Sequence, residues 1–368
     1  MADLLPSNAS AFERAAAEAI NPSARLAPAL DLMRRAKLVN IPQEWLPFLV
    51  YEYGLGPVSP YFDPEDDILG EGVAWQRVRG TKDAIDRALA WVGFAAEIEE
   101  ARVTRRRWNR FQLALDHFPE TEGTDLPAIE TLVGLSVPAR SIFFRGWSGY
   151  DVREAEWSIS RFSGARWSGS SGVRLHDGGP KWSFGETLDF AYTVGQDRLT
   201  ALGAWIDPPS GTAPTWGAYT WGSTSSTWDL AGLSTRNQSI AALLSGRPVW
   251  IRFFGPTNNV LGNRRARVAR PVLPDPAGVY EVNGSRYSPS GAGTAFYVEA
   301  LTDFGDDFEE DVARIEVIFD AVPADPATPG LMYAQTNTLT GGKWAARRDV
   351  AAQLRTTVRN RVRFLLTF

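Results

Sequence analysis

The sequence contains no cysteine and only two histidines, His117 and His176. The absence of cysteine excludes disulfides, thiolate metal sites and cysteine nucleophiles. Histidine is the most common general base and a frequent metal ligand, so two of them exclude a three-histidine zinc site and leave few candidates for a catalytic triad. We therefore expect no catalytic residues, no metal site and no cofactor.

The chain also lacks long apolar runs and an excess of positive charge. No stretch approaches the roughly 18 apolar residues that a membrane-spanning helix needs. The N-terminus, Met-Ala-Asp-Leu-Leu-Pro, has neither a basic nor an apolar region of a secretory signal, so none is predicted. The net charge of −5 argues against a general nucleic-acid-binding protein.

With 368 residues, the chain is long enough for two or three domains, and residues 1–94 read as a helical block. Ser10 and Glu13 form a capping box before an alanine-rich helix over 11–20. A second helix is predicted over 24–39. A third opens at Pro42 and carries apolar side chains on one side: Trp45, Leu46, Leu49, Val50 and Tyr53.

The last helix of this block is the most informative stretch. Gly80 breaks the preceding pattern, and Thr81 is predicted to cap the new helix by accepting a bond from a free backbone N–H. Gly93 ends the helix. Between them the apolar residues fall on one helical face: Ala84, Ile85, Ala88, Leu89 and Val92. Such a helix is built to pack, either inside this chain or against a partner.

In residues 95–149 the spacing of the apolar residues is no longer helical throughout, and the pattern predicts a small strand–helix–strand unit. Strands are expected at 111–116 and 141–146, with Ile98 in a preceding strand, and a helix at 126–135.

Residues 150–322 predict a β-rich domain with unusual tryptophan content. Nine of the 14 tryptophans lie between Trp147 and Trp250. Strands are predicted at 249–254, 295–300 and 314–319, with a turn at Asn283-Gly284. Tryptophan is favoured at interfaces, but it also fills small β cores. The candidates for distal contacts are Trp157, Trp167, Trp182, Trp216 and Trp221.

Residues 323–368 predict a proline-rich linker and a basic segment, in which seven Lys and Arg residues face one acid, Asp349. Val350, Leu354, Val358, Val362 and Leu365 recur at near-helical spacing. The segment is expected to bind something negative, either a membrane surface or an acidic protein. The candidates for acidic-partner contacts are Arg347, Arg348, Arg355 and Arg359.

Other charged motifs point to no specific chemistry. The acidic run at 303–311 does not match a calcium loop and is read as a solvated loop. The arginines at 102–110 are read as a solvated turn or a contact for an acidic protein, with nucleic acid as the weaker alternative. Gly-Glu-Gly at 70–72 lacks the rest of a dinucleotide fingerprint.

Four stretches, in order along residues 1–147, resemble the tail protein I family of contractile-tail bacteriophages. They are Leu4-Leu-Pro-Ser-Asn-Ala-Ser-Ala-Phe-Glu-Arg-Ala, Ile41-Pro-Gln-Glu-Trp-Leu-Pro-Phe-Leu-Val-Tyr-Glu-Tyr, Arg79-Gly-Thr-Lys-Asp-Ala-Ile-Asp-Arg-Ala-Leu-Ala-Trp-Val-Gly and Leu135-Ser-Val-Pro-Ala-Arg-Ser. The loop at 56–68 departs from the family, which often has a Trp-rich loop there. The resemblance becomes loose beyond residue 150.

The resemblance implies a structural, non-enzymatic baseplate wedge subunit in the virion, assembled in the host cytoplasm. It would join J-like wedge proteins in a triplex, contact a sheath initiator-like protein, and offer a distal attachment point for a tail fibre or its adaptor. Six such wedges would ring the hub. The residues expected to pack or to meet partners are Trp45, Leu49, Trp75, Arg79, Gly80, Thr81, Ile85 and Leu89.

Two alternatives stay open. The first is a carbohydrate-binding or glycan-degrading tail component that acts through the Trp-rich β domain. The second is the same wedge role in a tailocin or an extracellular contractile injection system. The predicted architecture is α+β and multidomain: a helical domain at 1–94, an α+β unit at 95–149, a β-rich domain at 150–322, and a linker with a basic segment at 323–368.

Overall fold

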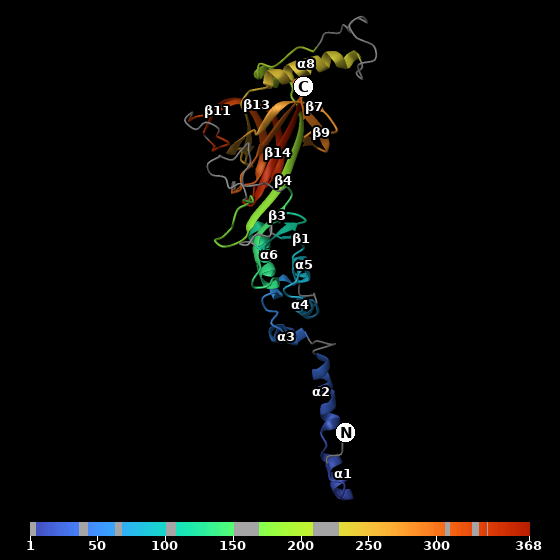
Figure 1. Ribbon diagram of the computed structural model, residues 1–368. Helices are drawn as coiled ribbons and strands as arrows, with labels where there is room; N and C mark the ends of the chain where they lie inside the picture. Colours follow the sequence, from blue (N-terminus) through green and yellow to red (C-terminus); the bar gives the residue numbers. More distant parts are fainter. Residues whose placement is uncertain are drawn as a thin grey trace. The chain divides into compact units, whose positions relative to one another are not determined.

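The computed structural model describes residues 5–36, 43–62, 68–100, 108–150, 169–208, 228–305, 310–325, 331–336 and 338–368. The fold is mixed α+β, as predicted (Figure 1). The chain divides into two compact units. One comprises Met1–Gly93 and Thr131–Pro138, and the other comprises Phe94–Glu130 and Ala139–Phe368. The four-part division expected from the sequence stays a prediction.

The first unit is helical. Its elements are α1 (Ala11–Ile20), α2 (Ser23–Ala36), the 3-10 turn η1 (Gln43–Trp45), α3 (Leu46–Glu52), the 3-10 turn η2 (Ser59–Tyr61), α4 (Ile68–Arg77) and α5 (Lys82–Ala90). The end of α6 (Glu122–Ser136), from Thr131 onward, also belongs to this unit.

The second unit contains most of α6 and every strand that the structure describes. Its other elements are β1 (Ala96–Glu100), β2 (Arg110–Leu115), β3 (Ile142–Ser148), β4 (Lys181–Thr193), α7 (Gln196–Ala201), α8 (Trp228–Leu244), β5 (Val249–Phe254), β6 (Val260–Arg265), β7 (Val268–Pro274), β8 (Tyr280–Val282), β9 (Ser285–Pro289), β10 (Ala295–Leu301), β11 (Val312–Pro323), β12 (Tyr333–Ala334), β13 (Leu339–Ala352) and β14 (Val358–Thr367).

Helix α1 begins at the predicted capping box. The backbone N–H of Glu13 donates to Ser10 Oγ at 3.3 Å, and the backbone N–H of Ser10 donates to Glu13 Oε2 at 2.7 Å. Two donors that the helix leaves free are thereby satisfied. The helix ends at Ile20, just before Pro22, as the sequence predicts.

Helix α5 ends at Ala90, earlier than predicted, so Val92 lies beyond it and is only partly buried, whereas the other residues of the predicted face are buried in the helix. Ala84, Ile85, Ala88 and Leu89 are all buried. The predicted cap at Thr81 is wrong in its chemistry: Thr81 stands at the N-cap, but its hydroxyl donates to the carbonyl of Val78 at 2.6 Å. The turn at Gly80, whose φ is +87°, brings that carbonyl within reach. A positive φ favours glycine at this position.

The core of the first unit forms around α4 and α5. Ala84 and Ala88 pack in one cluster with Trp75 of α4 and Leu132 of α6, and Leu49 of α3 completes it. Trp75 and Trp91 meet edge to face at 5.7 Å between ring centroids. The apolar spacing of α5 therefore serves packing inside this chain.

The described strands form two sheets. The order in the nine-stranded sheet is β1-β2-β3-β4-β14-β10-β7-β9-β8, and that in the five-stranded sheet is β12-β6-β5-β11-β13. The predicted strand–helix–strand unit is present as β2, α6 and β3, with Ile98 in β1. Its strands belong to the nine-stranded sheet, because β3 pairs in parallel with β4.

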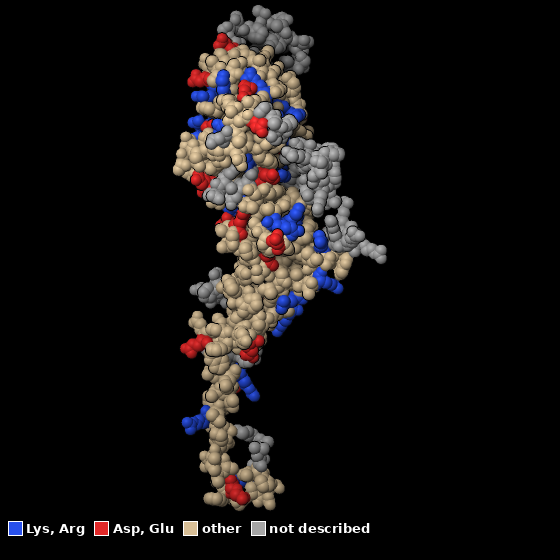
Figure 2. Space-filling model, turned by 90° about the vertical axis from the view of Figure 1, so that its left-hand side faces the viewer, with Lys and Arg blue, Asp and Glu red and all other residues tan. Residues whose placement is uncertain are grey.

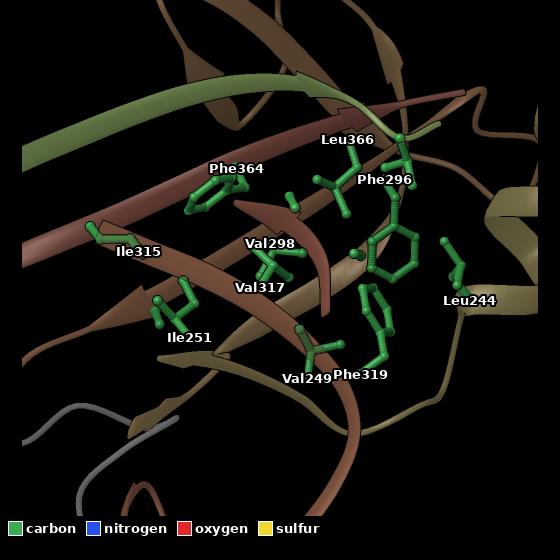
Figure 3. Close-up of a cluster of buried hydrophobic side chains, with 14 of the residues drawn as sticks. Leu244, Val249, Ile251, Phe296, Val298, Ile315, Val317, Phe319, Phe364 and Leu366 are labelled. Atoms are coloured by element: carbon green, nitrogen blue, oxygen red, sulfur yellow. The ribbon is translucent and has the colours of Figure 1, made fainter. Parts of the chain in front are cut away.

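The two sheets pack face to face around one core (Figure 3). Phe296 of β10 meets Phe319 of β11 at 5.8 Å between ring centroids. Alternate residues of β5, β10, β11 and β14 lie in this layer, as expected for a β-sandwich. Leu244, at the end of α8, is buried in the same cluster.

Several local predictions for the β-rich region are confirmed. Strands occur at β5, β10 and β11. Asn283 and Gly284 have φ of +49° and +77° and connect β8 to β9. Two positive φ values in succession characterise the tight turn that the Asn-Gly pair favours. The helices α7 and α8 were not predicted.

The near-helical spacing of the C-terminal segment is misleading, because residues 339–352 and 358–367 form strands. Strand β14 lies inside the nine-stranded sheet, parallel to β4 and antiparallel to β10. Its side chains alternate between the core (Val362, Phe364) and the opposite face (Arg361, Arg363). Part of the predicted linker, residues 326–330, lies outside the described residues.

Candidate assembly interface

Helices α1 and α2 carry apolar side chains that the chain itself does not bury. No residue of α1 is buried, and Phe12 and Ile20 are 81% and 78% exposed. In α2, Leu26, Leu30 and Met33 are 49–58% exposed. The spacing i, i+4, i+7 places these three on one helical face. Figure 2 shows few charged side chains on the viewed side of this segment.

Both helices are short for helices that lack buried contacts. Isolated helices shorter than about 12–15 residues are marginal in water, and α1 and α2 contain 10 and 14 residues. Complete burial of a leucine or phenylalanine side chain contributes about 1.5–3 kcal/mol. A partner that covered both apolar faces would add to the stability of these helices.

Helix α3 adds exposed aromatic side chains. Phe48 and Tyr51 are 76% and 87% exposed, whereas Leu49 is buried. Trp45, immediately before α3, is 37% exposed. Of the two predicted contact residues here, Leu49 packs inside the chain and Trp45 remains available to a partner.

The predicted residues of α4, α5 and their connection hold the end of α6. Trp75 is buried, and its Nε1 donates to Ser136 Oγ at 2.9 Å. The Arg79 guanidinium lies over the Trp75 ring, 5.0 Å from its centroid, and donates to the carbonyl of Leu135 at 3.0 Å. The backbone N–H of Gly80 donates to the carbonyl of Ser136 at 2.8 Å. The Arg-Gly-Thr stretch thus contributes to the internal structure of the first unit.

The structure places one of the five candidate distal tryptophans. Trp182 is fully buried, and its Nε1 donates to Glu130 Oε1 at 2.9 Å. Trp182 therefore packs in the interior of the second unit and is not available for a distal contact. Trp157, Trp167, Trp216 and Trp221 lie outside the described residues.

Three of the four candidate arginines already have partners within the chain. Arg347 Nε donates to Glu316 Oε1 at 2.7 Å, Arg355 donates to the carbonyl of Pro119, and Arg359 pairs with Asp303 at 3.4 Å. Arg348 is exposed on β13. The positive charge of the C-terminal segment is therefore partly neutralised internally, which weakens its attraction for an acidic partner.

The described residues offer no metal-binding group of three His, Cys, Asp or Glu side chains. The acidic run is described at Asp303, which pairs with Arg359, and at its far end, but residues 306–309 lie outside the described part. Of the basic run at 102–110, residues 102–107 also lie outside it. No helix in the described ranges has the length and apolarity to cross a membrane.

The two histidines do not form a common site with each other. His117 stacks on Phe94 at 4.5 Å between ring centroids. His176 Nε2 lies 2.6 Å from Glu130 Oε2, and the same carboxylate accepts from Trp182. Each histidine therefore has a local structural contact.

His176 is expected to make the stability of the second unit depend on pH. The hydrogen bond to Glu130 raises the pKa of His176 above its usual value. A raised folded-state pKa stabilises the fold below the unfolded pKa of about 6.5, and this stabilisation is lost as the pH rises through the folded value. Urea unfolding of the wild type and His176→Gln should differ most below the unfolded pKa of about 6.5 and converge once the pH exceeds the raised pKa of the folded state. Stability curves that stay parallel over this range would contradict the pairing.

Sequence reasoning centred on α5 and did not single out the exposed faces of α1 and α2. The signal was present in Leu26, Leu30 and Met33, whose spacing is as regular as that of α5. A pattern of this kind marks a face that will be covered, but it does not say whether the same chain or another chain covers it.

Comparison with known proteins identifies one family domain in the chain. Residues 5–140 match the model described as phage tail protein (Tail_P2_I), so the resemblance predicted from the sequence is confirmed. The matched range includes the exposed helices α1 and α2 and the Arg-Gly-Thr connection. No curated protein matches the chain. Residues 5–140 therefore form a phage tail protein I family domain, which is consistent with a structural role in a phage tail.

Proposed function

We propose that this chain is a non-enzymatic baseplate wedge subunit and that α1 and α2 hold it in a triplex with J-like wedge proteins. The observation that carries the proposal is the exposed apolar face of these two helices. Permanent interfaces are more apolar than the rest of a protein surface. Helices of the partner chains packed on this face would form a shared bundle.

The second unit would serve the distal end of the wedge. Its two-sheet core provides a rigid support, and the proposed contacts there are a tail fibre or its adaptor, with a sheath initiator-like protein as a further neighbour. Six triplexes would complete the baseplate ring of a phage tail. The same geometry would suit a tailocin or an extracellular contractile injection system.

The glycan-binding alternative has less support from the described residues. Trp182 is buried, and Trp147 is only partly accessible, with its Nε1 donating to Glu99 Oε2 at 3.2 Å. A sugar platform needs an accessible aromatic face.

Substitution of Leu30 tests the proposal. Leu30→Asp is expected to reduce recovery of the triplex at least tenfold in co-expression with the J-like protein, because the loss of about 1.5–3 kcal/mol of burial exceeds the 1.4 kcal/mol of a tenfold change. The thermal unfolding of the isolated chain should not change, since Leu30 is exposed. Affinity capture followed by size-exclusion chromatography measures the recovery.

Two variants provide the comparison. Arg35→Asp places the same new residue on the opposite side of α2, about half a turn from Leu30 at 100° per residue, and should leave the triplex intact. Leu89→Asp places a charge in the core and should unfold the first unit itself. Normal triplex recovery from a Leu26→Asp, Leu30→Asp double variant would refute the proposed interface.

A further inference from the structure

The outward face of the five-stranded sheet carries more arginines than acids. The sandwich core contains Ile251, Phe253, Ile315 and Val317. Their neighbours along β5 and β11 therefore point to the opposite side of the sheet. Strand pairing places arginines on this outward side in four strands: Arg252, Arg265, Arg314 and Arg347. The acids that the same pairing places there are Glu316 and Asp349, so positive charge is in excess.

A single buried carboxylate lies at the centre of this face. Glu316 is 4% exposed and is paired in register with Arg252 on one side and Arg347 on the other. Its Oε1 accepts from Arg347 Nε at 2.7 Å and lies 3.4 Å from Arg314 Nε. Asp349 makes no ion pair within the described residues. Three arginines thus adjoin one buried carboxylate.

Aromatic rings hold two of these arginines in place. The Arg314 guanidinium lies over the Phe254 ring, 4.2 Å from its centroid, and that of Arg347 lies over the Trp344 ring at 4.6 Å. A guanidinium that is already oriented loses less conformational freedom when it binds a ligand.

Arg252 offers hydrogen-bond donors that the described chain does not use. Its Nε donates to Asn263 Oδ1 at 2.8 Å, but its two terminal nitrogens make no hydrogen bond within the described residues. Burial lowers the pKa of the Arg252 guanidinium, and the charge of Glu316 opposes this shift. A partly buried charge that is incompletely compensated favours the binding of an anion.

The surroundings indicate the kind of anion. Guanidinium groups bind carboxylates and phosphates through parallel hydrogen bonds. The net charge of the chain is −5, so a long polyanion such as nucleic acid would also meet acidic surface. Arginine and tryptophan side by side, as at Arg347 and Trp344, are typical of the residues that dominate protein–protein interfaces.

We propose that the outward face of the five-stranded sheet binds an acidic segment of a neighbouring protein, whose carboxylates accept hydrogen bonds from the terminal nitrogens of Arg252 and Arg347. Arg265 and Arg314 add positive charge beside them. The proposal does not depend on the wedge role or on helices α1 and α2, which belong to the first unit.

Fluorescence anisotropy with the full chain tests the proposal. The probe is a labelled, capped hexa-aspartate peptide, and the capped hexa-asparagine peptide is its uncharged control at equal ionic strength. The acidic peptide should bind and the control should not. A thymidine oligonucleotide of equal charge should bind more weakly than the peptide, and tighter binding of the oligonucleotide would overturn the assignment to a protein segment.

Matched variants separate the arginine face from net charge and from folding. Arg252→Gln should weaken binding of the acidic peptide about tenfold, because hydrogen bonds between charged groups are strong. Arg270→Gln removes the same charge from an exposed position of β7 in the other sheet and should leave binding unchanged. The Tm of each variant, measured in parallel, distinguishes lost binding from lost folding.

Arg265→Gln provides a second variant that cannot break an internal contact. The Arg265 side chain makes no hydrogen bond or ion pair within the described part of the chain. Its removal should weaken binding about threefold, as expected for a charge at the rim of the site. Failure of the wild type to bind the acidic peptide, or equal binding by wild type and Arg252→Gln, would overturn the proposal.

Discussion

Trp182→Ala is expected to lower the free energy of unfolding of the second unit by about 3–5 kcal/mol, the range for removing a buried aromatic side chain. Trp182 is fully buried between Phe143 and Phe184, with ring centroids 5.7 and 5.9 Å away. Its indole N–H is also bonded to Glu130. Equilibrium urea unfolding measures the loss.

The site of Trp182 is shaped around the indole and cannot refill easily. Gly146 of β3 lies against the ring, so close that a Cβ added there would be 2.3 Å from Trp182 Cζ3. The alanine variant therefore leaves a cavity next to a residue that has no side chain to fill it. For the same reason Gly146→Ala should also destabilise the unit, by about 1–3 kcal/mol of overpacking.

Two comparisons separate packing from the simple loss of a tryptophan. Trp108→Ala removes a ring that is 60% exposed and should change stability by no more than about 0.5 kcal/mol. Trp182→Phe keeps most of the ring volume and should cost less than the alanine variant. If Trp182→Ala and Trp108→Ala had equal effects, the role of Trp182 in the core would be wrong.

Local patterns in the sequence were sufficient for the elements whose signals are short and unambiguous. Ser10 and Glu13 predicted the start of α1, and the apolar face of α5 emerged as predicted, from Ala84 to Leu89. The Asn283-Gly284 turn and the apolar runs of β5 and β10 were also predictable. In each case the element is specified by residues that are close in the sequence or by one continuous apolar run.

Strand β14 shows where such reasoning fails. Its apolar residues satisfy a near-helical spacing over a long window, but from Val358 to Phe364 every second residue is an arginine, at positions 359, 361 and 363. Its parallel pairing with β4 joins segments about 170 residues apart, and no local signal encodes it. Non-local pairing of this kind is set by tertiary packing.

The same distinction explains the candidate interface. The sequence indicated that the tryptophans and the apolar helical faces are contact surfaces. It could not tell whether they contact this chain or a partner, because the same residue types serve both purposes. Trp182 proved to be internal, whereas Leu30 is exposed. Only the fold separates the two cases.

Asp189→Ala is expected to destabilise the second unit by about 3 kcal/mol, near the lower end of the range for breaking a buried ion pair. Arg363 of β14 makes two parallel bonds to the Asp189 carboxylate of β4, at 2.6 and 2.8 Å. The two side chains are only 13% and 17% exposed. Asp189 Oδ2 also accepts from the backbone N–H of Asn283, so the variant removes a second contact.

Most of this cost should come from leaving Arg363 without its counter-charge, and a double-mutant cycle tests that origin. In the background of Arg363→Met, Asp189→Ala should cost less, with a coupling of about 1–3 kcal/mol. Glu281→Ala breaks the exposed pair with Arg286 at 3.8 Å and should cost no more than about 1 kcal/mol. Zero coupling between Asp189 and Arg363 would show that the pair contributes nothing to the joining of β4 and β14. A large coupling would instead show that the positive charge of Arg363 is neutralised by Asp189 within the sheet and stabilises the pairing of β4 with β14.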